Sequence, residues 1–286
     1  MHAPGQARIG AVVTTLVIGA LSLLWLIPLA MLGINAMKTT PEYFRDSSPL
    51  VLPANPGVVV RNLADAWANA GIGADLIASL VYGTTGAALG IACAALGAYG
   101  IARLNIRGRF FWFALVFSGS LFPIQMYLIP LFRLYLSTGL YDTQLGMILF
   151  YAAASIPFGL FVFRTFFATI PRDLQDAARL DAGDWSIFWR IFLPLAKAPM
   201  AVVFLFQFTW IWNDLAFGLV LSASDGVRPV TAGLAGMQSL YSTTGPPTLL
   251  AGAIIGTLPT LVLFLFLSRY MLTGLVLTTG TQAARD

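Results

Sequence analysis

The chain is 286 residues long, and 58% of its residues are hydrophobic whereas only 10% are charged. A soluble domain is about a quarter charged, so this composition excludes an ordinary soluble protein and indicates an integral membrane protein. The net charge is +4, but the basic residues are scattered over short segments and form no stripe that would bind nucleic acid. The single cysteine excludes a disulfide within the chain and a metal cluster held by several thiolates.

Long apolar runs occur six times along the chain. A helix that crosses a bilayer needs roughly 20 apolar residues, and each run is long enough. The sequence therefore predicts an all-α protein: an integral membrane bundle of six transmembrane helices with short cytoplasmic helices, in a single domain over residues 1–286. The predicted transmembrane helices cover residues of about 9–35, 76–102, 110–132, 143–166, 198–222 and 247–270.

The orientation of the bundle is predicted from its basic residues. Cytoplasmic loops of membrane proteins carry an excess of Lys and Arg, and most of the 16 such residues fall on the same side as the N-terminus. We therefore expect both termini in the cytoplasm. Residues 37–75 then form an extracytoplasmic segment, in which several prolines predict local turns.

The third predicted helix contains Gln125 and Tyr127 between Pro123 and Pro130. Proline removes a backbone donor and kinks a helix, which frees carbonyl groups that can face a cavity. Gln125 and Tyr127 are therefore candidates for the lining of a translocation pathway. A kink that serves only helix packing is the alternative.

A polar loop, residues 170–197, separates the fourth and fifth predicted helices. It carries a large share of the 12 acidic residues of the chain, namely Asp173, Asp176, Asp181 and Asp184. Proline at 171 ends the fourth helix, and apolar residues at helical spacing on both sides of Gly183 predict two short amphipathic helices. Such a loop can be offered to a soluble partner. The alternative is an interfacial helix whose aromatic side chains rest among the lipid headgroups.

The motifs of the polar loop resemble the EAA motif of permease subunits of binding-protein-dependent ABC importers. Asp176-Ala-Ala-x-x-Asp-Ala-Gly is followed by Ile191-x-Leu-Pro. Further segments are similar, in the same order, to the carbohydrate subgroup of maltose and glycerol-phosphate type: Ala98-Tyr99-x-x-Ala102-Arg103, Arg107-Gly-Arg109, Pro123 with Ile129-Pro-Leu131, Gly139-Leu-Tyr-Asp-Thr143, Ile170-Pro171 and Trp212-Asn-Asp214. Asp176 stands where the family usually has glutamate, and the loop is one residue shorter than usual.

The resemblance implies a transport subunit without catalytic activity of its own. Such a subunit translocates a sugar or sugar-like solute into the cytoplasm by alternating access, in a bacterial or archaeal cytoplasmic membrane. Its implied partners are a homologous second permease subunit, two copies of a cytoplasmic ABC ATPase, an extracytoplasmic solute-binding protein and membrane lipid. No cofactor is implied, because the ATPase binds the ATP. The implied ATPase-coupling residues are Asp176, Ala177, Ala178, Asp181 and Gly183.

The residues themselves agree with a subunit that obtains its energy elsewhere. A P-loop ends in Gly-Lys-Ser or Gly-Lys-Thr, but Lys38 follows a methionine and Lys197 an alanine. An intramembrane hydrolase is disfavoured, because one aspartate and no histidine lie within the apolar runs. An ion- or proton-driven secondary transporter is the alternative that composition alone allows.

Asp214 is the charged residue inside the fifth predicted helix. A carboxylate at that depth costs on the order of several kcal/mol unless it faces protein or water. With Trp212 and Asn213 it is a candidate for lining the route of a sugar, because sugars stack on aromatic rings and hydrogen-bond to amides and carboxylates. The alternative is a packing site that bends the helix and is bonded within the protein.

Overall fold

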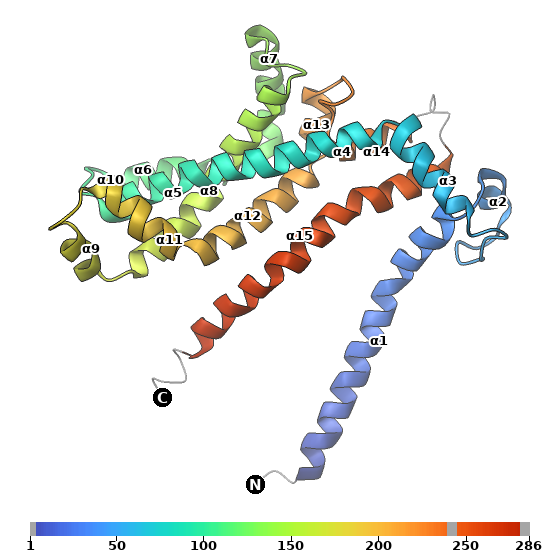
Figure 1. Cartoon of the computed structure of the whole chain (residues 1–286), viewed down its shortest axis with the longest axis horizontal. Coiled ribbons are helices and arrows are strands. Elements are labelled where there is room, and N and C mark those ends of the chain that lie inside the picture. The colour runs from blue at the N-terminus through green and yellow to red at the C-terminus, as the bar shows by residue number, and fades with distance from the viewer. Residues whose placement is uncertain (1–3, 239–244, 281–286) are drawn as a thin grey trace. The chain divides into compact units, whose positions relative to one another are not determined.

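The computed structural model describes residues 4–238 and 245–280, and all regular elements within these ranges are helices (Figure 1). The predicted all-α class is confirmed. The chain divides into two compact units: Met1–Ile72 with Leu234–Gly256, and Gly73–Gly233 with Thr257–Asp286.

The first unit begins with α1 (Pro4–Ala36), of which Val12–Ala36 is long and apolar enough to cross a membrane. A short folded cap follows, built from α2 (Thr40–Arg45), α3 (Val58–Ala64) and a π-helical turn η1 (Asp65–Asn69). Its centre is an ion pair in which Lys38 Nζ lies 2.8 Å from a carboxylate oxygen of Asp46. Nearby, the Asn62 amide donates to the carbonyls of Ala36 and Lys38. The segment predicted to contain local turns thus also contains helices around a buried charge pair.

The second unit is organised around two long helical segments. One runs without interruption from α4 (Ile72–Val81) through the π-helical turn η2 (Tyr82–Gly86) to α5 (Ala87–Arg103). The other is α8 (Gln144–Thr169), which packs along α5 (Figure 1). Glycine makes this approach possible, because a Cβ atom at Gly90 would lie 2.5 Å from the Cβ of Ser155 and one at Gly159 would lie 2.8 Å from that of Ala94. Small residues permit close helix packing in membranes.

The third predicted transmembrane helix is broken. The chain forms α6 (Arg109–Ser118), a 3-10 turn η3 (Ile124–Tyr127) and α7 (Leu128–Thr138) in place of one helix over 110–132. Pro123 explains the break, because proline disfavours helical backbone in the residue before it and lacks a donor. Pro130 causes no break, since it lies in the first turn of α7, where its missing N–H would have no helical partner.

The fifth predicted helix is also interrupted. It consists of α12 (Lys197–Trp212) and α13 (Ala216–Leu221), and a short α14 (Val230–Gly236) follows. Before α12, the polar loop contains α9 (Arg172–Ala178), α10 (Asp184–Ile187), a π-helical turn η4 (Phe188–Phe192) and α11 (Leu193–Leu195). The segment Asp184–Leu195 is bent by 74° relative to α12. The two short helices that the sequence predicts on either side of Gly183 correspond to α9 and α10.

Four helices among the described residues are long and apolar enough to cross a membrane. They are Val12–Ala36, Ile72–Arg103, Gln144–Thr169 and Pro246–Phe266, the last of these within α15 (Pro246–Gly280). A fifth is added if the bent pair Asp184–Leu195 and Lys197–Trp212 counts as one span. Six continuous helices were predicted, and the breaks at Pro123 and after Trp212 account for the difference. That these two broken segments each cross the bilayer stays a prediction.

Candidate functional sites

The polar loop, which includes α9, presents most of the predicted coupling residues at the surface. Asp176, Ala177, Asp181 and Gly183 are exposed. Ala178 is half-buried and packs against the apolar core beneath the loop. The structure therefore divides the predicted set into four surface residues and one that faces partly inward.

Gln175 anchors α9 to the rest of the second unit. Its side chain is buried, and its amide donates to the backbone carbonyl of Arg103 at 3.5 Å. Farther along the loop, Ile187, Phe188 and Phe192 are buried in the same apolar core. One side of the loop is thus fixed to α5, and the opposite side is left for solvent or a partner.

Arg179 connects α9 with α10. Its Nε and Nη2 atoms lie 3.1 Å and 3.0 Å from one carboxylate oxygen of Asp184, while its Nη1 is 3.9 Å from Asp176. The Asp176 side chain is 68% exposed, and exposed pairs of this kind contribute only about 0–1 kcal/mol. Asp176 therefore keeps most of its carboxylate available to a group outside the chain.

Large apolar side chains lie exposed beside these carboxylates. Leu180 is 85% exposed and Trp185 65% exposed, and Leu174 is exposed as well. Exposed apolar groups next to charges mark interaction surfaces in many proteins. The structure thus gives the loop both an apolar and an acidic component.

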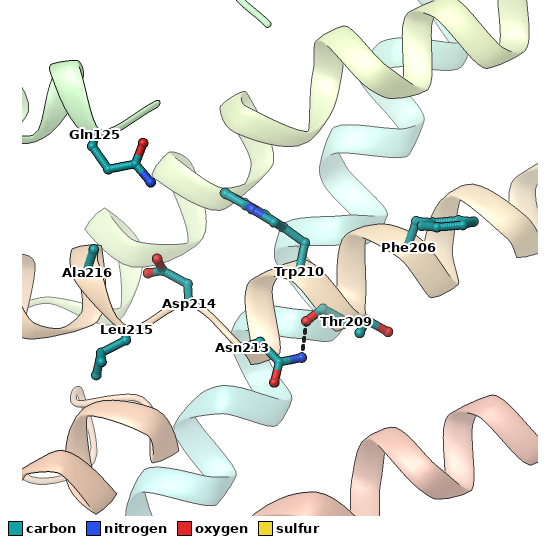
Figure 2. Close-up of a pocket in the computed structure, with 8 residues that line it drawn as sticks. All are labelled: Gln125, Phe206, Thr209, Trp210, Asn213, Asp214, Leu215 and Ala216. Atoms are coloured by element: carbon teal, nitrogen blue, oxygen red, sulfur yellow. Dashed lines mark hydrogen bonds between the residues drawn. The ribbon is translucent and has the colours of Figure 1, made fainter. Parts of the chain in front are cut away.

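The predicted pathway residues are only partly brought together. A cavity of about 560 Å³ is lined by residues from η3 and from the region where α12 ends: Gln125, Phe206, Thr209, Trp210, Asn213, Asp214, Leu215 and Ala216 (Figure 2). Trp212 lies elsewhere, because it is buried and its ring stacks on that of Phe208. Tyr127 lines a second, mainly apolar cavity of about 800 Å³, and Phe206 and Trp210 border both cavities.

Asp214 is bonded within the protein. The Tyr151 hydroxyl donates to its carboxylate at 3.0 Å, and the backbone N–H of Gly218 donates to the same oxygen at 3.2 Å. Gly218 belongs to the first turn of α13, so Asp214 satisfies a backbone donor that the helix leaves free. Figure 2 shows the carboxylate directed toward the side of the cavity where Gln125 lies. The hydrogen bonds favour the packing alternative for this residue, and its place in the cavity keeps the pathway role open.

Sequence reasoning missed several residues of this region. Tyr151 lies in an otherwise apolar run, where nothing local marks it as the partner of Asp214. Phe206 and Thr209 precede Trp210 and Asn213 by four residues each, the spacing of side chains on one helix face. That spacing is the signal by which they could have been found. Within the described residues, no group of His, Cys, Asp or Glu could hold a metal ion.

Residues 86–272 match the family described as "Binding-protein-dependent transport system inner membrane component". The chain belongs to this family. It is accordingly a multi-pass permease of a binding-protein-dependent ABC importer and a non-catalytic component of that complex.

Relatives and a solved structure agree with this membership. The chain is 39% identical to a probable ABC transporter permease protein of Pyrococcus horikoshii over 61% of this chain and 64% of that one. It is 31% identical to the melibiose/raffinose/stachyose import permease protein MelC of Bacillus subtilis over 87% of this chain and 89% of that one. The same fold occurs in a bacterial ABC transporter involved in the import of the acidic polysaccharide alginate, with a TM-score of 0.78 at 21% identity over 94% of this chain and 99% of that one.

Proposed function

We propose that this permease moves a sugar or sugar-like solute into the cytoplasm by alternating access, driven by a separate ATPase. The names of relatives such as the melibiose/raffinose/stachyose import permease support a sugar as the transported solute. The observation that carries the proposal is the surface of the polar loop, where exposed carboxylates lie beside exposed apolar side chains. The buried side chain of Gln175 holds this loop to the backbone carbonyl of Arg103.

The complex that we propose contains four kinds of subunit. This chain pairs with a homologous permease, and two copies of a cytoplasmic ABC ATPase bind the two permeases. An extracytoplasmic solute-binding protein delivers the solute. The excess of basic residues on one side of the bundle supports a polar loop and both termini in the cytoplasm.

The polar loop then serves as the contact with the ATPase. Asp176 and Asp181 can pair with basic side chains across an interface, and the small side chain of Ala177 permits close approach of the two backbones. When the ATPase subunits close on each other, such a contact moves as a rigid body. The movement favours the outward-facing or the inward-facing state of the bundle, and these states differ in affinity for the solute.

The smaller cavity is our candidate for part of the solute route. The ring of Trp210 can stack on the apolar face of a sugar, while Gln125 and Asn213 offer amide groups to its hydroxyls. The Asn213 amide nitrogen already donates to the backbone carbonyl of Thr209 at 2.7 Å, so its amide oxygen is the atom left to accept from a ligand. Trp212, buried against Phe208, has no part in this proposal.

Substitutions at Asp176 test the contact with the ATPase. The complex is reconstituted in vesicles with its binding protein, and ATP-dependent accumulation of labelled sugars is measured. Asp176→Lys sets a positive charge against the basic partner and is expected to abolish accumulation, whereas Asp176→Glu keeps the charge and is the matched control. Normal accumulation by Asp176→Lys would contradict the assignment of this residue, and accumulation without ATP would contradict the importer mechanism itself.

A further inference from the structure

The last turn of α5 holds the end of α8 through Arg103. The guanidinium Nη2 of Arg103 donates to the backbone carbonyls of Phe167 and Ile170. The last carbonyls of a helix have no partner within it, and a cation there also complements the helix dipole. Arg103 therefore caps α8 from a neighbouring helix, at the point where the polar loop begins.

The same arginine also touches two later parts of the loop. Its guanidinium carbon lies 5.1 Å from the ring centroid of Phe192, in η4, and its backbone carbonyl accepts from the Gln175 amide of α9. Arg103 Nε is buried without a hydrogen-bond partner among the described residues. One donor thus remains free for a different arrangement of the loop.

Tyr99, one turn before Arg103, holds the second half of the loop. Its hydroxyl donates to the backbone carbonyl of Asp184 at 3.1 Å, at the start of α10. Its ring is packed among those of Phe167, Phe188 and Phe192, with centroid distances of 6.4, 5.3 and 5.0 Å. Tyr99 is buried, so it cannot itself contact the ATPase.

We propose that Tyr99 and Arg103 are positioning residues that pass the movement of the polar loop to the helical segment Ile72–Arg103. The inference rests on the proposed function, in which an ATPase moves this loop. The chain itself connects the loop to α8 and α12, and these two side chains, together with Gln175, attach it to α5 as well.

The far end of the segment Ile72–Arg103 is tied to another loop. The Tyr82 hydroxyl donates to the Val227 carbonyl at 2.7 Å, and the Ser79 hydroxyl accepts from the Val230 N–H at 2.8 Å. Arg228 Nε lies 3.2 Å from an oxygen of Asp75. A shift of α5 therefore reaches residues 227–230 through side chains that are already in contact.

Two conservative substitutions test the proposal, each with a matched control. Arg103→Lys keeps the charge but loses the planar group that reaches two carbonyls and stacks on a ring, and Arg164→Lys, at an arginine stacked 4.3 Å from the Phe113 ring centroid, is its control. Tyr99→Phe removes one hydroxyl that donates to a backbone carbonyl. Tyr135→Phe, which removes the hydroxyl that donates to the Gly146 carbonyl at 2.8 Å, is the second control.

The measurement is the number of sugar molecules accumulated per ATP hydrolysed, in vesicles that contain the complete complex, with and without loaded binding protein. We expect the ATPase to co-purify normally with all variants. The ratio should fall roughly fivefold for Arg103→Lys and about twofold for Tyr99→Phe, the range of single substitutions along a coupling route. The controls should keep the wild-type ratio, because Arg164 contacts Phe113 of α6 and Tyr135 contacts Gly146 of α8, and none of these residues belongs to the polar loop.

An unchanged ratio in Arg103→Lys and Tyr99→Phe would overturn the inference, and so would an equal fall in the controls. If Arg103→Lys fails to assemble, the milder Tyr99→Phe decides alone. Failure of the wild-type chain to bind an ATPase would instead overturn the proposed function, and this outcome is visible before any ratio is measured.

Discussion

The two aspartates of α9 and two aspartates that contact the segment between α13 and α14 have opposite environments. On α9, Asp173 and Asp176 point into solvent. Asp75 is fully buried beside Arg228, and the Asp142 carboxylate accepts from the backbone N–H groups of Ala223 and Ser224 at 2.8 Å and 2.9 Å. One set is free to bind a partner and the other is used within the fold. The density of charge in the sequence does not distinguish them, whereas the hydrogen bonds do.

The largest expected effect is on the buried pair. Arg228→Ala leaves the carboxylate of Asp75 buried without its cation, and breaking a buried pair in this way costs about 3–5 kcal/mol of stability. Thermal unfolding of the purified protein in detergent would show a large loss. Arg228→Lys restores the charge and should recover part of the loss. If Arg228→Ala were as stable as the wild type, the Asp75 carboxylate would not depend on this pair.

A smaller effect, which depends on pH, is expected at Asp142. Burial acts to raise the pKa of this carboxyl, but the hydrogen bonds from Ser224 and Ala223 outweigh it, so the pKa is lowered. A lowered pKa contributes stability that is present above the unfolded value, about 3.9, and is lost as the pH falls through the folded value.

Asp142→Asn tests this contribution. Asparagine tolerates the positive φ of 54° at this position, so the change removes mainly the charge, at a cost of about 1–3 kcal/mol near neutral pH. The difference in unfolding free energy between wild type and variant should shrink as the pH falls through the acid range. A difference that stays constant with pH would contradict the role of the charge.

The smallest effect is expected on the polar loop itself. Asp173→Asn and Asp181→Asn alter exposed side chains, so each should change the unfolding free energy by less than about 0.5 kcal/mol. The same unfolding experiment measures both. A loss as large as that of Asp142→Asn would show that the loop carboxylates stabilise the fold, and the contrast between the two regions would disappear.

Much of the helical content could be predicted from hydropathy, because a long apolar segment in lipid must satisfy its backbone hydrogen bonds internally, and a helix does so. The predicted helices at 76–102 and 143–166 correspond to Ile72–Arg103 and α8. The breaks were harder to predict. Pro123 lies in the break between α6 and η3, whereas Pro130 lies in the first turn of α7, and which effect a proline has depends on where the surrounding turn starts.

The candidate sites show a similar limit. The polar loop could be located from its charges, and its exposed residues follow from the short helical pattern. The choice between Trp210 and Trp212 could not be made, because neighbouring residues on a helix point in different directions and both faces of α12 are apolar. The Lys38–Asp46 pair was missed as well, since only the fold of the cap brings these residues together.

Leu180 and Trp185 have a consequence for how cells must make this protein. Their exposed side chains form an apolar surface that is prone to aggregation whenever no other protein covers it. Copies synthesised in excess of their partners would carry that surface uncovered and would associate with unrelated proteins. Balanced production of the subunits, or rapid removal of unassembled copies by proteolysis, would limit such association.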